Sequence, residues 1–137
     1  LQAGVGGMAA AVAAMIRANW DLQPEIIVVE PEAAPCLRDS VAAGALVTVH
    51  GPVSIMGRLD CNDASLLAFA ILRDTAARYV PIRYSAGQKA ATRAAQIGIT
   101  STASGSAGFA AWLADHDSMD APPQAPLIIL SEGAEAV

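Results

Sequence analysis

A glycine-rich segment near the start of the sequence has the composition of a ligand-binding turn. Gly4-Val5-Gly6-Gly7 comes directly before an amphipathic helical pattern whose first turn contains no acid and no Ser, Thr or Asn that could cap it. The amides of a helix N-terminus are unpaired and carry a partial positive charge, and glycines allow the backbone to approach a ligand closely. The segment is therefore predicted to bind an anion such as phosphate. The alternative is a tight strand-to-helix turn in which water completes the cap.

The same glycines fit a second kind of site. Gly4-x-Gly6-x-x-Ala9 matches the dinucleotide-binding fingerprint, in which an acid at the end of the next strand binds a ribose, and Glu30 occupies such a position. Pro31 and Glu32 follow Glu30 at once, however, and this acid-rich turn counts against ribose binding. A dinucleotide oxidoreductase therefore ranks behind a non-catalytic nucleotide- or phosphate-binding Rossmann-like module among the functions considered.

Helical patterns alternate with short β-branched runs along the chain, which is typical of βαβ units and a parallel sheet. Pro81 favours an edge position for its strand because proline lacks an amide donor. We predict a single α/β domain over residues 1–137, with three layers and a mostly parallel sheet of about five strands that has helices on both faces. Helices are expected over residues 8–20, 36–43, 66–75, 85–97 and 107–114, and strands over residues 26–29, 46–49, 79–82 and 127–130, with residues 1–3 ending a further strand.

The composition argues against several classes of function. The 137 residues are enough for one core, and 54% are hydrophobic while only 4% are aromatic, so small side chains must pack closely. The net charge of −5 and the single lysine, Lys89, argue against a nucleic-acid partner. The longest strongly apolar stretch, residues 8–16, is shorter than the roughly 20 residues of a membrane span. We expect no membrane association.

Cysteines and histidines provide weaker candidates. Cys36 and Cys61 lack the spacing of a zinc site, so no metal is predicted. We interpret both cysteines as small buried side chains in the reducing cytoplasm, and a redox pair is the alternative. His50 at a strand end and His116 in an acidic loop have no Ser or Cys arrangement typical of a catalytic triad.

Five segments occur together in the order and spacing of one enzyme family. They are Leu1–Gly7, Val29–Pro31 with Cys36 soon after, Met56–Cys61, Ser104–Gly108 and Leu130–Gly133. With these segments the chain resembles the C-terminal part of the diaminopropionate ammonia-lyases, which are tryptophan-synthase-β-like, fold type II pyridoxal-phosphate enzymes. The resemblance covers essentially the whole chain, which we expect to be the cofactor-binding part of a longer enzyme.

The resemblance implies a role for each residue that matches the family's motifs. Gly4, Val5, Gly6 and Gly7 match the loop that wraps the phosphate of pyridoxal 5'-phosphate. Ser131 matches the position whose hydroxyl faces the pyridine nitrogen of the cofactor. A neutral hydroxyl there leaves the nitrogen unprotonated and weakens the ring as an electron sink, which suits α,β-elimination. The alternative for Ser131 is a turn residue after a strand.

Other positions depart from the family pattern or are missing. Arg58 adds bulk and charge where the family favours small residues, and Ala103 replaces a glutamate before the Ser-Gly of the second glycine loop. The Schiff-base lysine of the family lies before the phosphate loop, so Lys89 is not that lysine and is interpreted as a solvated helix residue. Asp60 is either a capping residue or a cleft residue that meets a substrate ammonium.

The implied activity is the elimination of ammonia from 2,3-diaminopropionate to give pyruvate, with a small amino acid as substrate and a homodimer as the assembly. The alternative on the same fold is a threonine- or serine-dehydratase-like enzyme. This segment alone is expected to be inactive because it lacks the Schiff-base lysine, so its catalytic residues are unknown.

Overall fold

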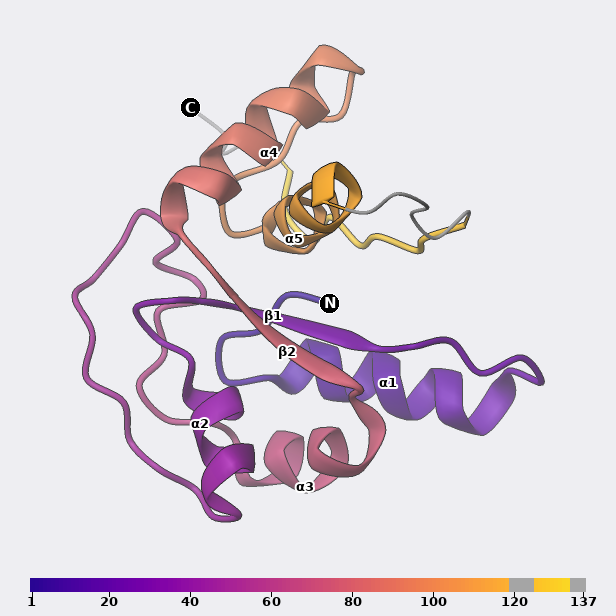
Figure 1. The fold of residues 1–137 in the computed structure, drawn as a ribbon, viewed down its shortest axis with the longest axis vertical. Helices are drawn as coiled ribbons and strands as arrows, with labels where there is room; N and C mark the ends of the chain where they lie inside the picture. The colour runs from indigo at the N-terminus through magenta and orange to yellow at the C-terminus, as the bar shows by residue number, and fades with distance from the viewer. Residues whose placement is uncertain (119–124, 134–137) are drawn as a thin grey trace.

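The computed structural model describes residues 1–118 and 125–133, which form three layers (Figure 1). A parallel pair of strands lies in the middle, with α1, α2 and α3 on one face and α4 and α5 on the other. The predicted α/β class is confirmed. In chain order the elements are α1 (Gly7–Asn19), β1 (Ile27–Pro31), α2 (Cys36–Ala43), α3 (Leu66–Thr75), β2 (Arg78–Ile82), α4 (Tyr84–Gln96) and α5 (Ala107–Ser118).

The sheet brings the first residues of the chain beside β1. β1 and β2 pair in parallel register from Ile27 opposite Arg78 to Pro31 opposite Ile82. On the other side of β1, Gln2 forms a parallel bridge with Val29. The β2 strand, which contains Pro81, therefore has β1 on one side and no described strand on the other, as the proline predicted.

Two of the predicted strands do not form, so the expected sheet of about five strands is wrong for the described residues. Residues 46–49 and 127–130 have no strand conformation. In the first of these segments the Val49 amide bonds the carbonyl of Asn62, which is an isolated loop contact. A β-branched run becomes a strand only when another strand lies beside it, because the ladder hydrogen bonds join two segments.

Two hydrophobic clusters hold the layers together, one on each face of the sheet. The adjacent strand residues Val28 and Val29 point to opposite faces, and both are almost fully buried. Val28 packs in the cluster with α1, α2 and α3, and Val29 packs in the cluster with α4 and α5. Alanines with no exposed surface, including Ala9 and Ala90, let the helices approach closely, as the composition predicted. No helix in the described ranges is long and apolar enough to cross a membrane.

Candidate functional site

The glycine segment forms a turn that only glycine can fill at two positions. Gly6 is the N-cap of α1 and has a φ of 94°, a left-handed conformation that disfavours other residues. A Cβ at Gly6 would lie 2.7 Å from Cδ1 of Leu37, and a Cβ at Gly4 would lie 2.8 Å from Sγ of Cys61. The strand-to-helix turn therefore passes close to α2 and to the Met56–Cys61 loop.

The N-terminus of α1 has the properties of an anion site. No side chain caps it, and its first turn contains no acidic residue. Gly7 is exposed, and a Cβ built on it would meet nothing within 4 Å. Exposed amides, a positive helix end and open space are together what a phosphate group requires. The residues present fit the phosphate of the predicted cofactor.

All five predicted cofactor residues line one cavity of about 220 Å³. The glycine segment forms one part of its wall, and Ser131 comes from the other end of the chain. A larger surface hollow lies elsewhere, near Pro52, Val53 and Tyr84, and does not touch the glycine segment. We take the smaller cavity as the candidate site because it joins the uncapped N-terminus of α1 to a hydroxyl. Its lining residues are Gln2, Ala3, Gly4, Val5, Gly6, Gly7, Met8, Arg58, Leu59, Cys61 and Ser131.

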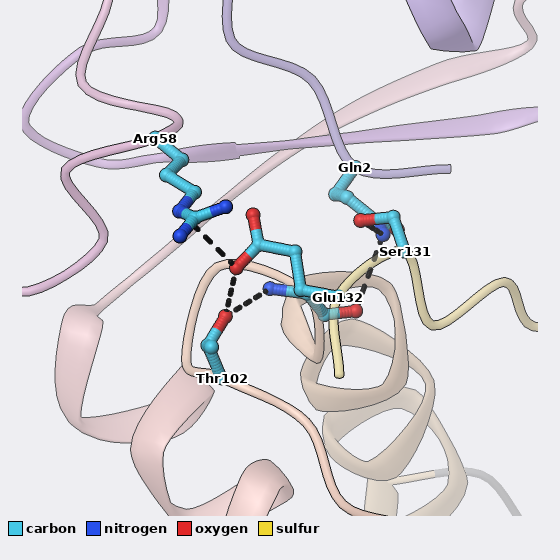
Figure 2. Close-up of polar contacts among 6 residues, drawn as sticks. Gln2, Arg58, Thr102, Ser131 and Glu132 are labelled. Carbon is cyan, nitrogen blue, oxygen red and sulfur yellow. Dashed lines mark hydrogen bonds and ion pairs between the residues drawn. The ribbon is translucent and has the colours of Figure 1, made fainter. Parts of the chain in front are cut away.

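Gln2 is a member of this cavity that sequence reasoning missed. Its side chain is buried, with 2% of its surface exposed. The Gln2 amide nitrogen donates to the Ser131 hydroxyl at 2.7 Å and to the Gly105 carbonyl at 3.1 Å (Figure 2). The only sequence signal was its place in the Leu1–Gly7 segment, because its partners lie more than 100 residues away.

Arg58 and Glu132 form a second polar group beside Ser131. The Arg58 guanidinium lies 3.8 Å from the Glu132 carboxylate, which also accepts a hydrogen bond from the Thr102 hydroxyl (Figure 2). Thr102 in turn accepts from the Gly105 amide at 3.0 Å. The charge of Arg58, which departs from the family pattern, therefore lies next to a carboxylate at the edge of the cavity.

The chain matches one enzyme family along nearly its whole length. Residues 1–132 match the family described as pyridoxal-phosphate dependent enzymes. The chain belongs to this family. The diaminopropionate ammonia-lyase of Escherichia coli (strain K12) is 37% identical over 82 residues, which are 58% of this chain and 21% of that protein. The resemblance to the diaminopropionate ammonia-lyases is thus confirmed, and the chain spans about a fifth of this relative's length.

Solved structures place the fold among pyridoxal-phosphate enzymes. A threonine deaminase from T.th. superimposes with a TM-score of 0.86 over 99% of this chain and 49% of its own, at 23% identity, which shows the fold alone. Escherichia coli diaminopropionate ammonia-lyase in complex with D-serine has a TM-score of 0.69 and 29% identity over 85% of this chain and 30% of its own. The predicted cofactor, pyridoxal 5'-phosphate, is confirmed as the cofactor of the family.

Several sequence candidates do not line the candidate cavity. Lys89 is exposed on α4, as expected for a solvated helix residue. His50 is also exposed. His116 was expected in a loop but lies in α5, which is longer than predicted, with its ring 4.9 Å from that of Trp112. Asp60 accepts a hydrogen bond from the Ser54 hydroxyl at 3.0 Å, which agrees with a capping role in its loop.

The two cysteines flank the glycine turn as free thiols. The Cys36 thiol lies 3.5 Å from the Gly4 carbonyl, and burial raises the pKa of Cys36 to about 12. Cys61 contacts the same glycine from the loop side. The prediction of a small buried side chain is confirmed for Cys36, Cys61 is partly buried, and the alternative redox pair is not formed.

Glu30 has a structural role that excludes ribose binding. Its carboxylate is fully buried and accepts hydrogen bonds from the amides of Leu37 at 2.8 Å and Arg38 at 2.9 Å. Both oxygens therefore cap the N-terminus of α2, where Pro35 provides no side-chain cap. Because Glu30, the acid on which the dinucleotide interpretation relied, is buried and occupied by α2, that interpretation loses its second element.

Proposed function

We propose that this chain is the C-terminal, cofactor-binding part of a pyridoxal-phosphate ammonia-lyase that converts 2,3-diaminopropionate and water into pyruvate and ammonia. One observation carries the proposal: the uncapped N-terminus of α1 and the Ser131 hydroxyl line the same cavity. Unpaired backbone amides can bind the phosphate at one end of the cofactor, and a neutral hydroxyl can face the ring nitrogen at the other end. The sequence match to diaminopropionate ammonia-lyase supports the choice of substrate.

Each residue of the cavity has a defined task in this proposal. The backbone of Gly4, Gly6 and Gly7 would bind the phosphate of the cofactor. The Ser131 hydroxyl would donate a hydrogen bond to the ring nitrogen. When bound, the cofactor stabilises negative charge at the substrate α-carbon.

The chain's own residues cannot complete the reaction. Its single lysine, Lys89, is exposed on α4 and lies in a surface hollow whose lining comes from that helix alone. We therefore place the Schiff-base lysine in another part of a longer protein and expect residues 1–137 alone to be inactive. We also propose that the longer protein is a homodimer. Its proposed location is the cytoplasm, which agrees with the free thiols of Cys36 and Cys61.

The phosphate role is tested by placing a charge at Gly7 in the longest natural protein that contains this chain. Gly7→Asp has open space for its side chain, and an acid at a helix N-terminus stabilises the helix by about 0.3–1 kcal/mol. The same carboxylate repels a bound phosphate, so pyridoxal phosphate should bind more than tenfold more weakly. Stability and cofactor affinity thus move in opposite directions.

Gly7→Asn is the matched control because it has the same shape without the charge. It should keep most of the cofactor affinity, measured by equilibrium dialysis with absorbance detection. Equal affinity in the Asp and Asn variants would show that the phosphate binds elsewhere. Gly6→Asp is a poor test, because the positive φ of Gly6 and its contacts with Leu37 and Ala68 would disrupt the turn itself.

The substrate is tested by measuring 2-oxo acid formation from diaminopropionate, serine and threonine with the same protein. The proposal predicts the largest kcat/KM for diaminopropionate. A larger value for threonine or serine would favour a dehydratase-like enzyme, whose fold is supported by the likeness to threonine deaminase.

A further inference from the structure

The orientation of the Gln2 amide can be assigned from its surroundings. The atom of this amide that faces the Gly105 carbonyl oxygen lies 3.1 Å from it. Two carbonyl oxygens at this distance would repel each other, so this atom is the nitrogen, which donates. The same nitrogen lies 2.7 Å from the Ser131 hydroxyl. Its two protons therefore have one acceptor each.

This orientation fixes the direction of the hydrogen bond to Ser131. The Gln2 nitrogen has no lone pair to offer, so the Ser131 oxygen must accept. Within the described residues, no acceptor takes the proton of the Ser131 hydroxyl. Ser131 is exposed and lines the cavity, so its proton is available to a group bound there.

The Gln2 side chain is held rigidly enough to impose this direction. It is buried, it bonds residues from the loop before α5 and from the segment after residue 125, and Gly108 of α5 packs against it (Figure 2). A Cβ at Gly108 would lie 3.2 Å from the Gln2 amide oxygen. That oxygen is buried without a hydrogen-bond partner in the described residues, which is an unfavourable state. Gln2 thus keeps its orientation although one of its polar atoms is unsatisfied.

We propose that Gln2 is a positioning residue that makes Ser131 an obligatory hydrogen-bond donor and thereby selects the unprotonated form of the cofactor ring nitrogen. This inference rests on the proposed function, since it requires the ring nitrogen to face Ser131. A protonated nitrogen would need the Ser131 oxygen as an acceptor while the serine proton remained without a partner. An unprotonated nitrogen accepts that proton and satisfies both groups.

Two variants of the holoprotein separate this role from packing. Gln2→Met fills the same space without a donor. Gln2→Glu is buried beside the Gly105 carbonyl and is therefore expected in its protonated form, whose O–H donates to that carbonyl and whose lone pairs accept the Ser131 proton. In the Glu variant the serine oxygen then turns a lone pair toward the ring. The ring nitrogen should be unprotonated in the wild type and become protonated in Gln2→Glu, in which the Ser131 hydroxyl is no longer an obligatory donor toward the ring.

The direct measurement is solid-state NMR of the holoprotein loaded with pyridoxal phosphate labelled with ¹⁵N in the ring. We expect the nitrogen resonance of Gln2→Glu to move to the protonated range, with the wild type in the unprotonated range. The same resonance in both proteins, with cofactor bound in each, would overturn the inference. A wild type that binds no cofactor would instead refute the proposed function.

A double-mutant cycle decides the question even when Gln2→Glu does not fold. Gln2→Met should weaken cofactor binding roughly two- to tenfold, the value of one lost hydrogen bond. In a Ser131→Ala background the same change should have almost no effect, because the group through which Gln2 acts is absent. Equal losses in both backgrounds would assign Gln2 a packing role only. Thermal unfolding of each variant verifies that the proteins compared are folded.

Discussion

Replacing Glu30 by glutamine tests which of two opposing effects controls a buried carboxylate. Burial disfavours the charged form of Glu30 and raises its pKa, whereas the amides of Leu37 and Arg38 and the positive charge of Arg38 favour the charged form and lower it. Burial is the larger effect, and it raises the pKa of Glu30 from its ordinary value of 4.5 to about 7. The folded protein therefore binds this proton more tightly than the unfolded chain does.

The sign of the stability change follows from this difference in proton affinity. Below pH 4.5 both states are protonated at Glu30, and its stabilising contribution is fully present. As the pH rises toward and through 7, the unfolded chain releases the proton first and the contribution is lost. At about 1.4 kcal/mol for each unit of pKa, the loss approaches roughly 3 kcal/mol.

The assay is urea unfolding of the wild type and of Glu30→Gln at several pH values between about 4 and 8. This range includes both pKa values of Glu30, 4.5 in the unfolded chain and about 7 in the folded protein. The difference in free energy of unfolding between the two proteins isolates Glu30, because all other groups titrate alike in both. Wild type should lose stability relative to Glu30→Gln as the pH rises. Glu32→Gln, the same change at an exposed side chain, is the control. A relative gain by the wild type with rising pH would mean that the two amide hydrogen bonds outweigh burial, and the reasoning would be wrong.

Substitutions at three further positions test the packing and the polar contacts by equilibrium unfolding. Leu72→Ala removes a fully buried side chain between α3 and α1 and should cost about 2–5 kcal/mol; a cost below about 1 kcal/mol would contradict the packing described. Ser65→Ala removes the side-chain cap of α3, which bonds the Ala68 amide at 3.4 Å, and should cost about 0.5–1 kcal/mol, whereas Ser65→Asp should retain the stability. Arg58→Met breaks the ion pair with Glu132 and should change stability by less than about 1 kcal/mol because the Arg58 side chain is 62% exposed.

Local signals in the sequence predicted the helices and the two paired strands well. Gly44, just after α2, has the left-handed conformation expected of a helix C-terminus, and the apolar run at residues 26–29 lies almost entirely within β1. Residues 46–49 have a similar composition but form no strand. The two segments differ in their pairing partners, because β1 pairs with Gln2 on one side and with β2 on the other. A propensity scale contains no information about which segments will lie side by side in the fold.

The candidate site could be predicted only in part for the same reason. Gly6 and Gly7 were identified because a missing helix cap is a local feature. The contacts of Gln2 with Ser131 and of Thr102 with Glu132 join distant segments, and nothing in either segment indicates its partner. The role of Glu30 depends on burial, which turned an apparent ligand-binding acid into the cap of α2.

The hydrogen bond between Gln2 and Ser131 also has a consequence for the order of folding. These residues are 129 positions apart, nearly the full length of the chain. The glycine turn and β1 are synthesised before Ser131, so the cavity lacks one wall until the segment that contains Ser131 has been made. Contacts of such long sequence separation form slowly because a large loop must close first. The helical layers can therefore assemble before the candidate cavity is complete, so formation of this cavity is expected to be a late step in folding.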